Sequence, residues 1–208
     1  GVGPVVLCNV LDPAKHTASY TEELQIVDGQ ATSKVKGVLL DGLTVAGKTL
    51  DEDYSVEYND EGCMVFTMLA GNTDPLNVTG KKLDPTKVKA ADIIGSYDAE
   101  TGVETGFELV RKVYPSFGLT PGLLLAPGWT QEPAVGIALD INGLFRCECL
   151  VDLDTETVTK YTDVEQAKAD SGITSEHAVL LWPKVRYAGK DMAYSAMYAA
   201  LVAYTDYQ

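Results

Sequence analysis

Few residues in this chain of 208 can carry metal, redox or nucleophilic chemistry. It has two histidines, four cysteines and two tryptophans. No stretch reaches the roughly 18 uninterrupted apolar residues of a membrane-spanning helix. Basic residues are also scarce, since 16 Lys and Arg stand against 30 Asp and Glu and leave a formal charge of −14. Affinity for a phosphate backbone comes from Lys and Arg. We therefore expect no nucleic-acid partner and no membrane insertion.

What the chain does have is the composition of a globular protein. Apolar residues make up 46% of it and charged residues 22%, which excludes a disordered chain. It starts at Gly1 without an initiator Met or a leader, and it stops directly after a helical pattern, so we expect that both ends are cut from something longer. No CxxC pair occurs among the cysteines, which favours reduced thiols in a cytosolic compartment; they are Cys8, Cys63, Cys147 and Cys149.

The hydrophobic pattern changes near residue 91 and predicts two domains. Residues 1–91 are β-rich: short apolar runs at 35–40, 54–58 and 63–69 are separated by turn signals, and residues 5–10 also form a strand-like run. We expect a sandwich or barrel-like domain here. Its end carries a lysine cluster, which predicts a partner-facing surface or, more simply, a solvated loop; the lysines are Lys81, Lys82, Lys87 and Lys89.

Residues 92–208 alternate between helical and strand patterns. The pattern predicts helices over 104–114, 133–143, 163–169 and 192–204, and strands over 122–126, 145–153 and 178–182. Successive β–α–β units imply at least partly parallel pairing. We therefore expect an α/β domain with a mixed, partly parallel sheet, and an α+β fold overall.

One segment fits a nucleotide-binding motif. Gly42–Thr49 (GLTVAGKT) matches the phosphate-loop pattern GxxxxGK[ST]. Such a loop needs a strand before it and a helix after it. The residues after Thr49 form an acidic turn and a strand pattern instead. We interpret the segment as a β-hairpin. A small α/β hydrolase or nucleotide-binding protein is the alternative function.

The other chemical patterns are incomplete. Asp152 and Asp154 begin like the DxDx[TV] motif of aspartyl-phosphate phosphatases, but Glu156 breaks it; we interpret these residues as a strand exit and turn. Cys147 and Cys149 share one face of a predicted strand and are typical of a core. A zinc site needs about four ligands, and neither histidine, His16 or His177, lies at ligand spacing. We therefore predict no catalytic, cofactor-binding or metal-binding residues, and not an enzyme.

The second half carries a series of short motifs in a definite order. They are ADIIG (91–95), DAETG (98–102), GFEL (106–109), PGLLLAPGW (121–129), EPAV (132–135), ING (141–143), VDLDT (151–155), YTDV (161–164) and WPKV (182–185). This order resembles the core of tail sheath proteins from contractile-tailed bacteriophages and related prophages. The opening GPVV (3–6) and NVLDP (9–13) is similar to the entry to the β-rich domain of that family.

The resemblance implies a structural role. Sheath subunits assemble in the bacterial host cytoplasm, polymerise around the tail tube in the virion and contract to drive the tube through the host envelope. The implied partners are neighbouring sheath subunits, the tail tube protein and the baseplate, and no cofactor is implied. The family's N- and C-terminal arms, which link neighbouring subunits, are absent from this sequence. The resemblance therefore implies an internal fragment, which we expect to be monomeric or weakly associating.

Overall fold

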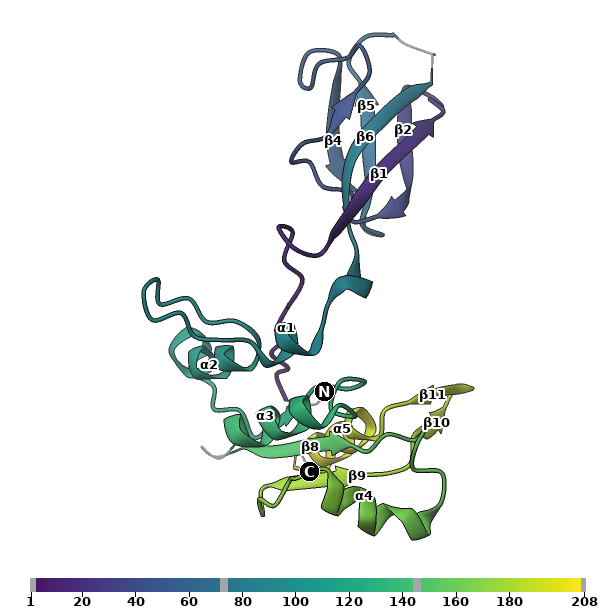
Figure 1. Cartoon of the computed structure of the whole chain (residues 1–208). Helices are drawn as coiled ribbons and strands as arrows, with labels where there is room; N and C mark the ends of the chain where they lie inside the picture. The colour runs from purple at the N-terminus through teal and green to yellow at the C-terminus, as the bar shows by residue number, and fades with distance from the viewer. Residues whose placement is uncertain (1–2, 72–74, 144–146, 207–208) are drawn as a thin grey trace. The chain divides into compact units, whose positions relative to one another are not determined.

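The structure is a computed structural model, and it describes residues 3–71, 75–143 and 147–206 (Figure 1). Packing groups the chain into two compact units. One consists of Leu11–Val88, here the β-rich unit, and the other of Gly1–Val10 with Lys89–Gln208, here the α/β unit. The functional domains expected from the sequence, 1–91 and 92–208, stay a prediction.

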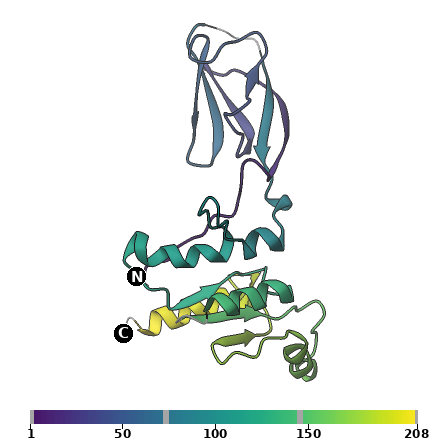
Figure 2. The same ribbon diagram turned by 60° about the vertical axis from the view of Figure 1, so that its left-hand side comes forward.

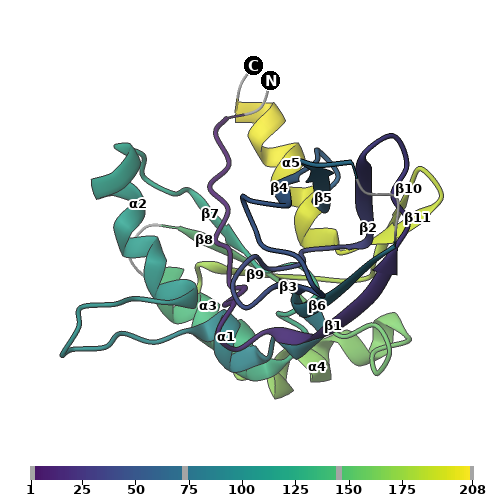
Figure 3. The ribbon, with the colours of Figure 1, turned by 90° about the horizontal axis from the view of Figure 1, so that it is seen from above.

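The β-rich unit consists of two antiparallel sheets of three strands each. The first has the order β1-β6-β3, with bounds Thr17–Leu24, Leu76–Leu83 and Thr44–Val45. The second has the order β2-β5-β4, with bounds Gln30–Lys36, Cys63–Met68 and Tyr54–Tyr58. A short 3-10 helix, η1 (Pro85–Lys87), follows β6. Figure 3 shows the strands of this unit from above.

One apolar core joins these two sheets. Alternate residues of a strand point to opposite faces, and the buried set comes from both sheets. From the first sheet it takes Tyr20, Leu24, Val45, Leu76 and Val78. From the second it takes Ala31, Tyr54, Met64 and Phe66. The unit is therefore a small β-sandwich, one of the two architectures expected from the sequence.

The α/β unit is built on a parallel sheet. Its strands are β7 (Leu123–Leu125), β8 (Glu148–Asp152) and β9 (Ala178–Leu181), paired in the order β7-β8-β9. Helix α3 (Pro133–Gly143) packs on one face, where its Leu139 meets Cys149 and Val151 of β8. Helix α5 (Tyr194–Asp206) lies on the other face, where Asp152 bonds to Ser195. Figure 2 shows both helices beside the strands.

Shorter elements complete the α/β unit. They are α1 (Ala90–Ile94), η2 (Gly106–Leu109), α2 (Val110–Phe117), η3 (Tyr161–Asp163), α4 (Val164–Asp170) and the hairpin strands β10 (Val185–Tyr187) and β11 (Lys190–Met192). Within the described ranges, no helix combines the length and the apolar character that a membrane crossing needs.

The expected fold class is confirmed: antiparallel sheets come first and a parallel sheet with helices follows. Three local predictions are wrong. The apolar run over 35–40 is not one strand, because β2 ends at Lys36 and only an isolated bridge follows at Val38. Residues 5–10 form no strand, because an apolar run becomes a strand only where a neighbour supplies the hydrogen-bond ladder. The helix expected over 104–114 begins only at residue 106, as a 3-10 turn, and it buries Val113, whereas Tyr114 is exposed.

Candidate functional site

The loops that leave the three parallel strands meet at one edge of the sheet. Because β7, β8 and β9 run in the same direction, their carboxyl ends lie side by side. Ligands of open α/β sheets bind outside this edge. The loops concerned are 126–132 after β7, 153–160 after β8 and 182–184 after β9.

Asp152 joins three elements at this edge. Its backbone N–H donates to Thr130 Oγ1 over 3.0 Å, which ties the loop after β7 to β8. Its carboxylate accepts hydrogen bonds from the Ser195 backbone N–H, over 2.8 Å, and from Ser195 Oγ, over 2.5 Å. Only 4% of Asp152 and none of Ser195 is exposed. Asp152 thus holds the first turn of α5 against the sheet, and both its carboxylate oxygens are occupied.

Asp154 closes the turn that follows β8. Its carboxylate accepts from the Glu156 N–H over 2.9 Å and from Thr157 Oγ1 over 3.0 Å. Farther along the loop, the Val158 carbonyl accepts from Trp182 Nε1 over 2.8 Å. The interpretation of this segment as a strand exit and turn is confirmed, because β8 ends at Asp152 and a turn follows over 155–157.

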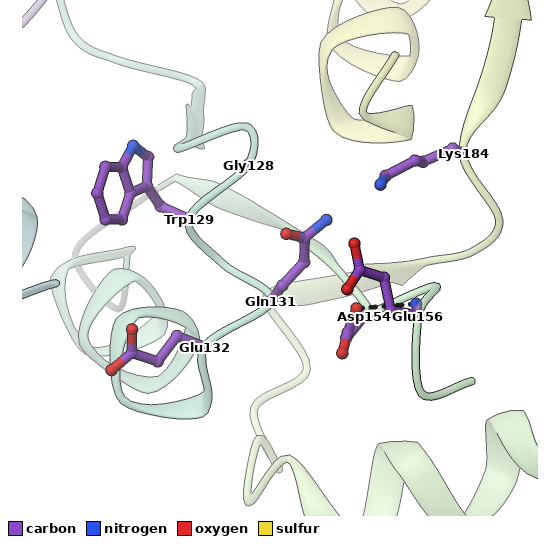
Figure 4. A pocket seen from close by; sticks show the side chains of 7 residues that line it. All are labelled: Gly128, Trp129, Gln131, Glu132, Asp154, Glu156 and Lys184. Carbon is purple, nitrogen blue, oxygen red and sulfur yellow. Dashed lines mark hydrogen bonds between the residues drawn. The ribbon is translucent and has the colours of Figure 1, made fainter. Parts of the chain in front are cut away.

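A hollow of about 380 Å³ lies between these loops (Figure 4). In the close-up, the side chains of Gln131, Asp154, Glu156 and Lys184 gather on one side, and those of Trp129 and Glu132 lie on the other. Three carboxylates and one ammonium group line this space. A second hollow, of about 520 Å³, shares Gln131 and Asp154 with the first and runs on toward α4.

The segment that fits the phosphate-loop pattern is a hairpin. Val45 forms an antiparallel bridge with Lys48, and β3 pairs with β6. The N–H of Lys48 donates to the Val45 carbonyl over 3.1 Å, and the N–H of Thr49 donates to Asp53 Oδ2 over 2.7 Å. A turn and β4 follow the segment where a phosphate loop needs a helix. The β-hairpin interpretation is confirmed, and the amides of Lys48 and Thr49 already have partners.

The thiols and imidazoles are distributed over both units of the chain. Cys147 and Cys149 are buried, and their thiols donate to the carbonyls of Pro121 and Leu139 over 3.1 and 3.2 Å. Burial raises the pKa of both thiols, that of Cys149 to about 12. His16 is buried in the β-rich unit, whereas His177 is exposed in the α/β unit. The part of the chain that the structure describes has no group of three residues placed to hold a metal ion.

The lysine cluster is divided between the two units. Lys81, Lys82 and Lys87 belong to the β-rich unit. Lys89 belongs to the α/β unit, where its backbone N–H donates to Asp92 at the start of α1. Lys81 and Lys82 are consecutive residues of β6, so their side chains point to opposite faces of the sheet. The four lysines therefore do not form one surface.

The edge of the parallel sheet was not singled out from the sequence. Its lining residues lie in three segments, and only the order of the strands brings these together. A signal was present, because the motifs over 121–129, 132–135, 151–155 and 182–185 contain five of the seven residues that line the first hollow: Gly128, Trp129, Glu132, Asp154 and Lys184. The other two, Gln131 and Glu156, each lie next to a motif in the sequence.

The chain is similar to a known phage protein. Over 156 residues, 67% of this chain, it is 33% identical to the tail sheath protein of Burkholderia phage BcepMu. The match covers 31% of that protein, so this chain spans about a third of the relative's length. No family model and no solved structure matches the chain. The resemblance that the ordered motifs indicate is confirmed: the chain is a distant relative of a phage tail sheath protein.

Proposed function

We propose that the chain is part of a structural subunit of a contractile phage tail sheath, which polymerises around the tail tube and contracts to drive the tube through the host envelope. The observation that carries the proposal is the 33% identity to a protein named as a tail sheath protein. The role is structural rather than enzymatic. Its location is the tail of the virion, after assembly in the bacterial host cytoplasm.

The proposed partners are neighbouring sheath subunits, the tail tube protein and the baseplate. The fold suits such a role, because a subunit that moves as a rigid body needs units that keep their own shape. The β-rich unit has one core between two sheets, and the α/β unit has a parallel sheet with a helix on each face. Arms beyond this chain would link neighbouring subunits by adding strands to their sheets.

Electron microscopy tests this proposal. The complete translation product of the gene is expressed without other phage proteins and negatively stained, beside the 208-residue chain. We expect tubes or stacked rings from the complete product and isolated particles from the chain. Isolated particles from both, at concentrations where a sheath protein polymerises, would contradict the proposal. A stable ring formed by the 208-residue chain alone at micromolar concentration would contradict the role given to the arms.

A further inference from the structure

The α/β unit carries a basic hairpin, here defined as residues 184–192, which contains β10 and β11. Lys184, Arg186 and Lys190 stand against one carboxylate, Asp191, and leave the hairpin a formal charge of +2 in a chain of −14. Arg186 Nε and Asp191 Oδ1 form an ion pair over 3.1 Å. The two lysines are exposed and belong to no ion pair among the described residues. The excess of positive charge therefore lies on these lysines.

One face of the basic hairpin is apolar apart from one lysine. Residues directly opposite each other in an antiparallel pair share a face, as do residues two positions apart in one strand. Val185 pairs with Met192 and Tyr187 pairs with Lys190, so these four side chains lie on the same face. Tyr187 is 63% exposed, and neither hydrophobic core of the described residues includes a residue of the hairpin. An isolated two-stranded hairpin is only marginally stable, so a partner that covers this face would stabilise it.

The same unit carries an acidic hairpin, here defined as residues 96–105, between α1 and α2. It contains no lysine or arginine, and its carboxylates are Asp98, Glu100 and Glu104. A hydrogen bond from the Thr101 hydroxyl, together with those from two backbone N–H groups, lowers the pKa of Asp98. Glu104 pairs with Lys112 of α2 over 3.7 Å. Glu100 is exposed and belongs to no ion pair among the described residues. The hairpin therefore keeps an excess of negative charge.

The acidic hairpin has a fixed shape. Tyr97 and Glu104 form an antiparallel bridge, and the N–H of Thr105 donates to the Ser96 carbonyl over 3.0 Å. Tyr97 and Val103 are 54% and 53% exposed, and no residue of this hairpin belongs to either core of the described residues. A segment that is already ordered loses little conformational entropy when it binds. The hairpin thus presents exposed apolar side chains on a preformed support.

We propose that the acidic hairpin of one copy binds the apolar face of the basic hairpin of a second copy. The contact covers an exposed tyrosine on each side, Tyr97 and Tyr187, and brings Glu100 of one copy near Lys190 of the other. Tyrosine is enriched at protein interfaces. Complementary charges set the register and the rate of association more than its strength. This contact rests on the proposed function, because it is one between neighbouring sheath subunits.

The two hairpins extend from opposite sides of the α/β unit. In Figures 1 and 3 the acidic hairpin projects beside α1 and α2, and β10 and β11 project on the other side of the sheet. The two surfaces differ, so a contact between two copies is heterologous and leaves one hairpin of each kind free for further copies. Such a contact builds a ring or a helix, whereas a contact between identical surfaces would end at a dimer.

Charge reversal on each hairpin tests the contact. The variants are E100K and K190E, and both side chains are exposed. E100K removes most of the negative charge of the acidic hairpin, and K190E removes the excess positive charge of the basic one. We expect each variant alone to associate about tenfold more weakly than the unmodified chain. An equimolar mixture should regain most of the loss, because the unmodified basic hairpin of E100K can bind the unmodified acidic hairpin of K190E.

A third variant, Tyr187→Ser, tests the apolar part of the contact without changing any charge. It should also weaken association about tenfold. The matched controls are E176K, K160E and Tyr161→Ser, which make the same changes at exposed positions elsewhere in the α/β unit and should leave association unchanged. Association is measured by sedimentation velocity on the 208-residue chain up to about 1 mM, where weak complexes become populated. Circular dichroism checks that each variant is folded.

Two outcomes would overturn the proposal: no self-association of the unmodified chain over this range, or hairpin variants that associate like their controls. Charge variants that are each weakened but do not rescue one another would also overturn it, and would point to a different partner for each hairpin. The same substitutions are made in the complete translation product. If that product forms tubes and the variants form them equally well, this contact is wrong while the sheath function stands. If it forms no tubes, the function itself fails.

Discussion

The buried carboxylate of Asp152 caps the first turn of α5 through Ser195, by accepting hydrogen bonds from both its backbone N–H and its hydroxyl. Asp152 is the last residue of β8, and Ser195 is the second residue of α5. The two are 43 positions apart in the sequence. This pair therefore fixes the helix to the central strand of the parallel sheet.

Replacing Asp152 with Ala should destabilise the α/β unit strongly. The substitution leaves two buried donors of Ser195 without acceptors, and we expect a loss of about 2–4 kcal/mol in the free energy of unfolding. Ser195→Ala removes only the hydroxyl and should cost about 1 kcal/mol. Urea unfolding followed by tryptophan fluorescence is a suitable measurement, because both tryptophans, Trp129 and Trp182, lie in this unit.

The matched control for Asp152→Ala is Glu156→Ala, because the Glu156 side chain is exposed. Equal losses of stability in the two variants would show that the hydrogen bonds between Asp152 and Ser195 do not stabilise the unit.

Two glycines, Gly95 and Gly106, allow the backbone segments around them to approach each other closely beside α1. A Cβ on Gly95 would lie 1.9 Å from the Thr105 carbonyl oxygen, and one on Gly106 would lie 2.5 Å from the Ile93 carbonyl oxygen. We expect Gly95→Ala or Gly106→Ala to cost several kcal/mol, since backbone atoms must move apart. Gly102 is the control: it has a similar φ, +69°, but nothing lies within 4 Å of its Cβ position, so Gly102→Ala should cost only about 1 kcal/mol. Thermal unfolding of the three variants compares these costs. Equal shifts in Tm would contradict the close backbone approach at Gly95 and Gly106.

Sequence patterns predicted the elements whose signal is local. The helix over 133–143 and the strand over 54–58 have the expected bounds. Pro133 marks the first turn of the helix, and turn residues flank the strand. The run over 5–10 shows the limit of such patterns, since its apolar residues indicate a strand but nothing in the sequence tells whether a neighbouring strand is there to pair. The hairpin at Lys48 could be told from a phosphate loop because the residues after it alternate like a strand.

The candidate site was much harder to predict, for a topological reason. Gln131, Glu156 and Lys184 follow three different strands, and they meet only because those strands are parallel and adjacent. The Asp152–Ser195 bond depends on which face of the sheet α5 covers. The sequence pattern predicts a helix over 192–204 but not the strand residue that the helix meets.

The segment Gly42–Thr49 should not bind nucleotides. Its Lys48 and Thr49 amides are used within the hairpin, and phosphate binding would require both to give up their acceptors. Isothermal titration of the chain with Mg-ATP and Mg-GTP should show no saturable heat, and Lys48→Ala should behave identically. Saturable binding that Lys48→Ala abolishes would instead support the alternative of a nucleotide-binding protein.

The stability of the α/β unit should fall at alkaline pH through Cys149. Burial, and then the nearby charges of Asp140 and Cys147, raise the pKa of its thiol from 9.0 to about 12. Between these two values the unfolded chain loses the thiol proton while the native chain keeps it, so the native state binds more protons and its free energy of unfolding decreases as pH rises. Below pH 9 both states keep the thiol proton, so Cys149 no longer makes the free energy of unfolding depend on pH.

Cys149→Ala should reduce the loss of stability between pH 9 and pH 12. The free energy of unfolding is measured by urea unfolding under reducing conditions with tryptophan fluorescence. The comparison with the unmodified chain separates this thiol from the tyrosines that titrate over the same range. An identical slope in both proteins would mean that Cys149 ionises as easily in the native state as in the unfolded one, and hence that the face of β8 against α3 admits water.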